Sequence, residues 1–425
     1  MPTANININE KADNFQRFDM AKKPQRQKNY LRPVTWLLSF PTVWKHKLKV
    51  YKVNMKGLRP PYILLSNHTS FMDFKVLTAA IFPCRANYVV AIDGFIGREA
   101  LLRKVGCICK RKFTNDISLI RHINQVVNIN KDIIVLHPEA RYSLVGTTAI
   151  LPPSLGKLVK FLNVPVVVLN MHGNYLNSPC WNLEERGNRT EAQLTQIITR
   201  SQIKILTNEQ INDRINKALV YDEYAWQKEK NVIIKYKNNA KGLHKVLYQC
   251  PACMTEFQMD SDKNRIWCRH CGKEWIMSEL GELKAASGIT EFTHIPDWYE
   301  FERAQVRRQI NEKTYEFFDD VLVDSLPNSK GYIRLGPAKL SHNMNGFCLE
   351  GNFDRKSLTL YKEPLSMYSC HIEYDYLGGD DCIDLSTLED TYYIYPQGKL
   401  FSVTKISLAT EELFKFYSEA HLKRS

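Results

Sequence analysis

The sequence predicts an α/β domain with a mostly parallel sheet, followed by a small metal-binding module and a β-rich C-terminal domain. Between about Lys47 and Asn177, short apolar segments alternate with amphipathic ones, which is typical of a layered α/β domain with a parallel sheet. Two C-x-x-C pairs follow, between Cys250 and Cys271. Beyond Trp275 the chain consists of short alternating segments with Gly and Asp turns, which is typical of β-rich domains.

Length and composition indicate a globular protein of two to three domains. The chain has 425 residues, of which 44% are hydrophobic and 24% are charged, and disordered chains have fewer apolar residues. The formal net charge is +13, which suits a polyanionic partner such as an anionic membrane surface, nucleic acid or a phosphorylated small molecule. Basic residues gather in positions 1–60, whereas positions 373–390 are acidic.

Residues 1–45 are predicted to form a basic leader and a membrane-interface segment. Positions 30–44 are apolar, contain two tryptophans, and are flanked on both sides by lysine or arginine. Such a composition is typical of a segment that lies in the interface of an anionic bilayer. A helix packed on the surface of the domain is the alternative. Pro33 and Pro41 interrupt the segment, and it is too short to cross a bilayer.

We expect the protein to be cytoplasmic and peripheral on the inner face of a membrane. The N-terminal residues are polar, and no run of about 20 apolar residues exists, so neither a secretion signal nor a transmembrane span is predicted. Eleven cysteines, four of them in C-x-x-C pairs, indicate a reducing compartment and not a disulfide framework.

Residues 46–220 form the predicted α/β domain, and 221–247 a charged, helical connector. The predicted strands are apolar throughout and span 62–66, 86–92, 132–138 and 164–173. The predicted helices are amphipathic and span 70–82, with Ser70 available as a cap, 116–130 and 154–164. A polar segment with a possible strand follows, and then a helix from about Asn208.

Residues 248–278 are predicted to form a zinc ribbon. Two C-x-x-C pairs, Cys250 with Cys253 and Cys268 with Cys271, are separated by fourteen residues, which is the spacing of a four-cysteine zinc site. Because four thiolates leave no ligand position open, the expected zinc is structural.

Residues 279–425 are predicted to form a β-rich domain that ends in an amphipathic helix at about 409–421. A β-meander capped by a C-terminal helix resembles a pleckstrin-homology-like domain. Our hypothesis is that the C-terminal half docks a protein partner or regulates access to the membrane.

His68 and Asp73 are the candidate catalytic pair. His68 lies where the predicted strand 62–66 meets the predicted helix 70–82, and Asp73 lies in the first helical turn. A carboxylate in this position can bond one imidazole nitrogen while the other faces a cavity at the carboxyl edge of the sheet. The alternative is a buried histidine at a strand end, because an H-x-x-x-x-D match is common by chance.

Two polar segments at strand ends supply further candidates. Residues 137–143, His-Pro-Glu-Ala-Arg-Tyr-Ser, contain Glu139, Arg141 and Ser143, and residues 106–112 end in a cluster of three cations. That cluster consists of Lys110, Arg111 and Lys112. Cations of this kind bind phosphate, although clustered charges are more often solvated surface.

The order and spacing of these segments resemble the glycerolipid acyltransferase family over residues 45–220. Asn67, His68 and Asp73 match its first motif, N-H-x-x-x-x-D. The third motif, commonly F-P-E-G-T-R, reads H-P-E-A-R-Y here, so the proline and glutamate match, the glycine is Ala140, and the arginine comes one position early. Gly106 and Ile108 match the second motif, which ends in an arginine whose place is taken by one of the three cations 110–112, and which one is open. The apolar run 164–169 matches the fourth motif.

The resemblance implies transfer of an acyl group to 1-acylglycerol-3-phosphate, giving phosphatidate. His68 would be the general base and Asp73 would orient it. The donor would be acyl-CoA or acyl carrier protein. The cation cluster 110–112, Arg141, Glu139 and Ser143 would bind the acceptor. No serine or cysteine of the motifs is paired with a base, so direct transfer without an acyl-enzyme is the simpler mechanism.

Three alternatives remain open. The acceptor could be glycerol-3-phosphate or another lysophospholipid. The protein could be a non-catalytic lipid-binding scaffold, which would not need the pair His68 and Asp73. A nucleic-acid-binding zinc-ribbon protein is the third, and we expect no nucleic acid because the basic residues lie far from the ribbon, which is not strongly positive.

Overall fold

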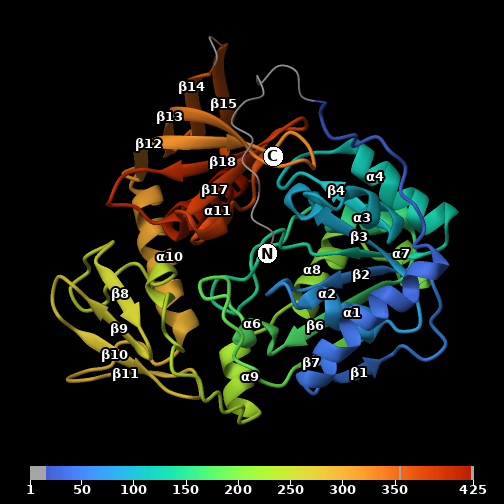
Figure 1. Ribbon diagram of the computed structural model, residues 1–425, viewed down its shortest axis with the longest axis horizontal. Helices are drawn as coiled ribbons and strands as arrows, with labels where there is room; N and C mark the ends of the chain where they lie inside the picture. The colour runs from blue at the N-terminus through green and yellow to red at the C-terminus, as the bar shows by residue number, and fades with distance from the viewer. Residues whose placement is uncertain (1–15, 354–355, 423–425) are drawn as a thin grey trace. The chain divides into compact units, whose positions relative to one another are not determined.

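The computed structural model describes residues 16–353 and 356–422, and these form two compact units (Figure 1). The α/β unit comprises Asp19–Lys110 and Asp116–Lys235. The β-rich unit comprises residues 16–18, Arg111–Asn115 and the chain from Tyr236 onward. The first fifteen residues of the predicted basic leader lie outside the described part of the chain. No helix of the described residues is long and apolar enough to cross a bilayer.

The α/β unit is built on a seven-stranded sheet, and the prediction of a mostly parallel sheet is confirmed. The strands lie in the order β1-β7-β6-β2-β5-β3-β4, and only the pair β6 and β7 is antiparallel. Their bounds are β1 (Lys49–Val53), β2 (Ile63–Ser66), β3 (Ala86–Ala91), β4 (Cys107–Lys110), β5 (Ile133–Leu136), β6 (Val166–His172) and β7 (Glu191–Ile198). Every residue of β2 and β5 is buried, which explains why these strands are apolar throughout.

The helices of this unit follow the predicted alternation with altered ends. They are α1 (Arg32–Lys45), α2 (Asp73–Ala80), α3 (Glu99–Lys104), α4 (Ile117–Asn124), α5 (Leu155–Leu162), α6 (Asn174–Asn177), α7 (Arg200–Ile205), α8 (Asn208–Ala218) and α9 (Glu223–Glu229). Helix α2 begins at Asp73 and not at the predicted cap Ser70, whose side chain instead accepts a hydrogen bond from the backbone N–H of Met72 at 3.2 Å. A π-helical turn, Gln125–Ile129, continues α4.

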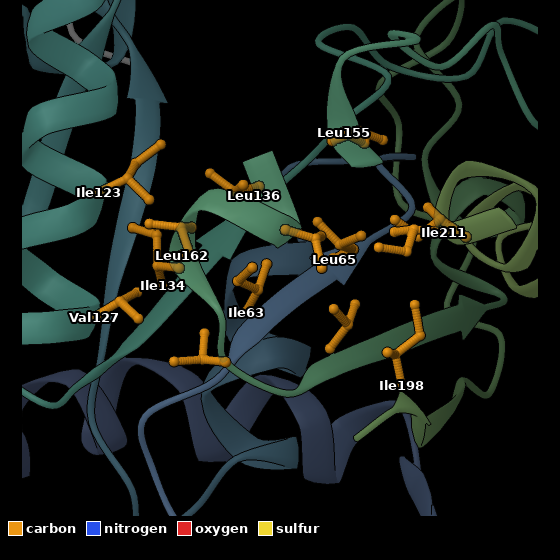
Figure 2. Close-up of a cluster of buried hydrophobic side chains, with 14 of the residues drawn as sticks. Ile63, Leu65, Ile123, Val127, Ile134, Leu136, Leu155, Leu162, Ile198 and Ile211 are labelled. Carbon is orange, nitrogen blue, oxygen red and sulfur yellow. The ribbon is translucent and has the colours of Figure 1, made fainter. Parts of the chain in front are cut away.

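One apolar cluster joins the sheet to four of these helices. Side chains of β2, β5 and β6 meet side chains of α4, α5, α7 and α8 in this cluster. Figure 2 shows Ile63, Ile134 and Leu162 among them. Each buried aliphatic side chain of this kind contributes about 1.5–3 kcal/mol to folding. The cluster therefore fixes β2 and β5, whose carboxyl ends carry His68 and Glu139.

The predicted connector 221–247 is α-helical only in α9, and a short 3₁₀ turn lies at Leu243–Lys245. Asn231 adopts a left-handed conformation with φ +48° directly after the helix, and Val232 and Ile234 are buried in the irregular chain that follows. Buried β-branched residues and a left-handed asparagine disfavour continuation of a helix. The predicted helix therefore does not extend to Tyr248.

The first part of the β-rich unit is a four-cysteine module beside a long helix. Four short strands form an antiparallel sheet in the order β11-β10-β9-β8. They are β8 (Met259–Asp262), β9 (Arg265–Cys268), β10 (Glu274–Met277) and β11 (Leu283–Ala285). Trp275 of β10 is buried against Trp298 of α10 (Ile295–Asn311), with ring centroids 4.8 Å apart. The module is thereby packed on α10.

The second part is a seven-stranded antiparallel sheet with a C-terminal helix, so the predicted β-rich region is confirmed. The strands lie in the order β15-β14-β13-β12-β18-β17-β16. Their bounds are β12 (Glu316–Ser325), β13 (Ile333–Asn343), β14 (Gly346–Phe353), β15 (Lys356–Lys362), β16 (His371–Glu373), β17 (Cys382–Ser386) and β18 (Thr391–Pro396). Helix α11 (Val403–Leu422) begins six residues earlier than predicted and packs against α10 and β16.

Candidate functional site

The carboxyl end of β2 is tied to β6 by one side chain. The amide of Asn67 donates to the carbonyl of Met171 at 2.8 Å, and its oxygen accepts the N–H of Met171 at 2.9 Å. Two hydrogen bonds to one backbone residue hold the strand ends in register. His68, the next residue, therefore leaves the sheet from a fixed position.

His68 and Asp73 form a hydrogen-bonded pair. Nδ1 of His68 lies 3.0 Å from Oδ2 of Asp73, and the aspartate is only 1% exposed. Asp73 also accepts the backbone N–H groups of Thr69 and Ser70, at 2.6 and 3.1 Å, and the amide of Asn174 at 2.8 Å. Burial by itself would raise the pKa of Asp73, but the bonds from His68 and these donors lower it. The aspartate is therefore an ionised acceptor that can orient the imidazole.

Two aromatic rings contact the imidazole of His68. His137 stacks on it at 4.2 Å with an interplanar angle of 19°, and Tyr142 lies at 4.3 Å. Burial, together with His68, lowers the pKa of His137 to about 3, so His137 is neutral. The side chain of His68 is 25% exposed, and its Nε2 makes no hydrogen bond within the described residues. Partial exposure and the absence of a described partner on Nε2 are what a base that meets a substrate hydroxyl requires.

Glu139 lies in a turn after β5 and is fully buried. Ala140, the next residue, has a positive φ of +56°, which explains why glycine suits this position in the resembling motif. The hydroxyl of Tyr221 donates to both carboxyl oxygens of Glu139, at 3.2 and 3.1 Å, and the N–H of Ala149 donates at 3.3 Å. Burial raises the pKa of Glu139 to about 8, against the opposing effect of Arg141.

Arg141 and Ser143 lie in the same turn. Arg141 is buried and donates to the carbonyl of Tyr142 at 3.0 Å. The N–H of Ser143 donates to the carbonyl of His68 at 2.8 Å, and its hydroxyl donates to Thr147 at 2.7 Å. The turn that carries Glu139, Arg141 and Ser143 is therefore bonded directly to His68.

The three predicted cations 110–112 are divided between the two units. Lys110 ends β4 in the α/β unit, whereas Arg111 and Lys112 belong to the β-rich unit. Arg111 donates four hydrogen bonds to residues of the β-rich unit, and Lys112 lies 3.1 Å from Asp384. The structure does not group Arg111 and Lys112 with the pair His68 and Asp73.

A second histidine–carboxylate pair, which sequence reasoning missed, lies at the end of β6. Nδ1 of His172 is 2.8 Å from Oε1 of the fully buried Glu223, whose other oxygen accepts the N–H of Gly173 at 2.6 Å. Burial would lower the pKa of His172, but Glu223, Glu191 and Glu229 raise it. The two partners are 51 residues apart in sequence, so no short motif could have indicated this pair.

The four predicted zinc ligands lie together. The sulfur atoms of Cys250, Cys253, Cys268 and Cys271 are all within 4.8 Å of one another. The pairs Cys250–Cys271 and Cys253–Cys268 have sulfur–sulfur distances of 3.7 Å. Four sulfurs at about 2.3 Å from a tetrahedral ion lie about 3.8 Å apart, so the residues fit zinc. All four positions would be filled by thiolates, which is the donor set of a structural site.

Comparisons with known proteins find similarity to solved structures. No family model matches the sequence, and no curated protein matches it. Among solved structures, the chain is similar to the 1-acyl-sn-glycerophosphate (LPA) acyltransferase PlsC from Thermotoga maritima, with 13% sequence identity and a TM-score of 0.36. The similarity covers 45% of this chain and 77% of that one.

Proposed function

We propose that the protein is an acyltransferase that moves a fatty acyl group from an activated donor to the free hydroxyl of 1-acylglycerol-3-phosphate, giving phosphatidate. The observation that carries the proposal is the pair His68 and Asp73, in which Nδ1 is held by a buried carboxylate and Nε2 is left open. This is the arrangement of a general base that abstracts a proton from an alcohol.

The reaction follows from this geometry. Nε2 of His68 takes the hydroxyl proton while the acceptor oxygen attacks the carbonyl carbon of the acyl thioester. The carbon–sulfur bond then breaks, the new ester bond remains, and the proton passes from His68 to the leaving thiolate. Asp73 stabilises the imidazolium between these steps. The stacked ring of His137 and the tilted ring of Tyr142 restrict the orientation of the imidazole.

His68 is a better candidate base than His172. A general base must be neutral before it accepts a proton, and three glutamates raise the pKa of His172 and favour its cationic form. We therefore assign His172 and Glu223 a structural role, in which they hold α9 against the end of β6.

Acceptor phosphate binding is assigned to Arg141 and Lys110. Both belong to the α/β unit, together with His68. Glu139 has a raised pKa and is largely protonated near neutral pH, so Glu139 itself offsets little of the positive charge that Arg141 presents to an anion. Ser143 positions the turn through its backbone bond to His68.

Peripheral binding to the inner face of a membrane, from the cytoplasm, fits the chemistry of helix α1. Leu37, Leu38 and Trp44 are 73%, 65% and 71% exposed, and basic residues precede and follow the helix. Exposed apolar and aromatic side chains beside cations bind anionic interfaces. The acyl substrates of the proposed reaction lie in such a bilayer.

The C-terminal additions are given supporting roles. Zinc, when bound, would cross-link the two cysteine pairs and stabilise the ribbon. A four-stranded and a three-stranded meander closed by α11 support a pleckstrin-homology-like fold for the last domain. Our hypothesis is that a protein partner binds to residues 279–425. A pull-down that compares the full chain with a chain lacking these residues tests it. Retention of every partner by the shortened chain would contradict the hypothesis.

The experiment that tests the function is an acyl-transfer panel in mixed micelles. The donors are acyl-CoA and acyl carrier protein, and the acceptors are 1-acylglycerol-3-phosphate, glycerol-3-phosphate and a neutral monoacylglycerol. We expect ester formation with 1-acylglycerol-3-phosphate above all. Preference for another acceptor would change the proposed substrate. A folded protein that transfers to no acceptor would favour the alternative of a non-catalytic lipid-binding scaffold.

A further inference from the structure

The three residues that follow β4 are bound by the β-rich unit. The guanidinium of Arg111 donates to the carbonyls of Leu326, Pro327 and Glu389, at 3.0, 2.9 and 2.7 Å, and to the hydroxyl of Thr391 at 2.9 Å. The first two acceptors lie in the loop between β12 and β13, and the other two lie at the start of β18. The side chain of Arg111 therefore connects two loops at one end of this sheet.

The next two side chains are held in the same unit. Lys112 is paired with Asp384 of β17, which also lies 2.7 Å from His371 of β16. Burial by itself would raise the pKa of Asp384, but Lys112 and His371 lower it. Phe113 is buried and packs edge-on against Tyr368, with ring centroids 5.1 Å apart. Each of the three consecutive side chains thus has a specific partner.

The same loop also binds the chain that precedes the α/β unit. The N–H of Phe18 donates to the carbonyl of Pro327 at 2.9 Å, and the amide of Asn328 donates to the carbonyl of Gln16 at 2.8 Å. The loop between β12 and β13 therefore holds two segments, on either side of Asp19–Lys110 in the sequence.

Phosphate binding by Arg111 would require these bonds to break. Four of the five N–H donors of a guanidinium are used by protein acceptors, and the residue is 1% exposed. Arg111 and Lys112 have the composition of a phosphate site, but their contacts are those of a structural anchor.

We propose that Arg111, Lys112 and Phe113 form an internal anchor through which the β-rich unit positions the chain between β4 and α4, and that acyl transfer depends on this anchor and not on phosphate binding by these cations. The rate effect rests on the proposed acyltransferase function, whereas the anchor itself does not. Arg111 is then a positioning residue. The C-terminal half is required for turnover because it holds the segment that joins β4 to α4.

Three variants of the full chain distinguish an anchor from a phosphate site. Arg111→Lys keeps the charge that a phosphate would need but loses the planar fork that reaches four acceptors. Asp384→Asn removes the partner of Lys112 without touching either cation. Lys339→Met is the matched control, because Lys339 is 62% exposed and pairs only with the exposed Asp320 among the ion pairs described.

Hydrogen exchange and steady-state kinetics are measured for these variants. Hydrogen exchange of the amides of residues 111–115 should accelerate by roughly tenfold or more in Arg111→Lys and Asp384→Asn and stay unchanged in the control. In these two variants, kcat should fall by a similar factor with an acceptor that carries a phosphate and with one that lacks it. The KM for each acceptor should be unchanged. Lys112→Met is measured alone and combined with Asp384→Asn. The double variant should lose less than the sum of the two singles, because each single removes the Lys112–Asp384 pair.

Other outcomes overturn the proposal. Unchanged exchange in Arg111→Lys and Asp384→Asn would show that no anchor exists. A rise in KM for the phosphate-bearing acceptor alone would assign Arg111 to the phosphate. Faster exchange with unchanged kcat would show that turnover does not depend on the anchor. If the wild type transfers acyl groups to no acceptor, the proposed function fails, while hydrogen exchange still decides the anchor.

Discussion

Asp73 has several hydrogen-bond partners at once, and this explains why a carboxylate is needed there. It accepts from the ring of His68, from two backbone N–H groups and from the amide of Asn174. An asparagine offers one acceptor oxygen in place of two. The residue is therefore both the orienting group of the proposed base and a brace for the turn before α2.

Replacing Asp73 with asparagine tests this double role. We expect kcat to fall by roughly 10²–10⁴-fold, because the imidazolium loses its counter-charge and its tautomer is no longer fixed. A melting temperature lowered by a few degrees should accompany the loss. Asn216→Ala, at an exposed position of α8, provides a control for general damage, and an active Asp73→Asn enzyme would contradict the assigned role.

Glu139 gives a pH dependence of stability whose sign is fixed by its raised pKa. The folded protein keeps the proton up to about pH 8, whereas an unfolded chain loses it near pH 4.5. Between these values the folded state binds more protons, so stability falls as pH rises, by at most about 1.4 kcal/mol per unit. Above pH 8 the effect is complete.

Glu139→Gln should remove that slope. In urea unfolding from about pH 5 to about pH 9, the difference in free energy between wild type and variant should shift in favour of the variant as pH rises. A constant difference over this range would mean that the carboxyl group is ionised throughout.

At this scale the sequence predicted the pair His68 and Asp73 but not its surroundings. The pair is only five residues apart, within one strand–helix junction. Asn174 and Tyr221 reach the site from 101 and 82 residues away from their partners. Such residues come together only when the sheet folds. A local pattern in one sequence does not indicate contacts between residues so far apart.

Among the elements, the four-cysteine ribbon is the one that we expect to depend on a metal ion. Its strands have three or four residues each, too few to be stable alone. We expect a chelator, or Cys268→Ser, to unfold residues 248–285 and to expose Trp275, seen as a red shift of tryptophan fluorescence, with release of about one zinc ion per chain. Unchanged fluorescence after the metal is removed would contradict this role.

Helix α1 is the element that tests membrane binding. Replacing Leu37 and Leu38 with serine removes apolar surface that is 73% and 65% exposed, so folding should be unaffected while vesicle binding weakens by about tenfold or more. Co-sedimentation with anionic and with neutral vesicles measures this. Exchange of the equally exposed Leu183 for serine is the control, and binding equal to wild type would exclude α1 as the contact.

The elements that were predicted well are those with a strong periodic pattern. Strands β2, β5 and β6 are largely buried and apolar. The alternation of such segments with amphipathic ones predicted the parallel sheet. The predicted helix beyond α9 was wrong because Asn231 and the buried Val232 and Ile234 follow it. Charge content alone could not distinguish an exposed helix from irregular chain packed on a domain.

For the whole molecule, the sequence suggested consecutive domains, and the structure divides the chain differently. Arg111–Asn115 belongs to the β-rich unit although the residues on both sides belong to the α/β unit. The resemblance of Lys110, Arg111 and Lys112 to a phosphate motif rested on composition. Which acceptors Arg111 meets depends on loops more than 200 residues away, which no local pattern encodes.

The net charge of the molecule predicts how association responds to salt. With a formal charge of +13, binding to anionic vesicles should weaken as ionic strength rises, because the Debye length falls from about 10 Å at 0.1 M to about 3 Å at 1 M. Vesicle binding that is equally strong at both concentrations would show that apolar insertion dominates.

The most direct test of the central claim is to compare the two histidine–carboxylate pairs. Acyl transfer to 1-acylglycerol-3-phosphate is measured for wild type, His68→Asn and His172→Asn, with circular dichroism to verify folding. We predict that kcat/KM falls by roughly 10²–10⁴-fold in His68→Asn and by less than about tenfold in His172→Asn. A folded His68→Asn enzyme that keeps its activity, or an equal loss in both variants, would contradict the assignment of His68 as the base.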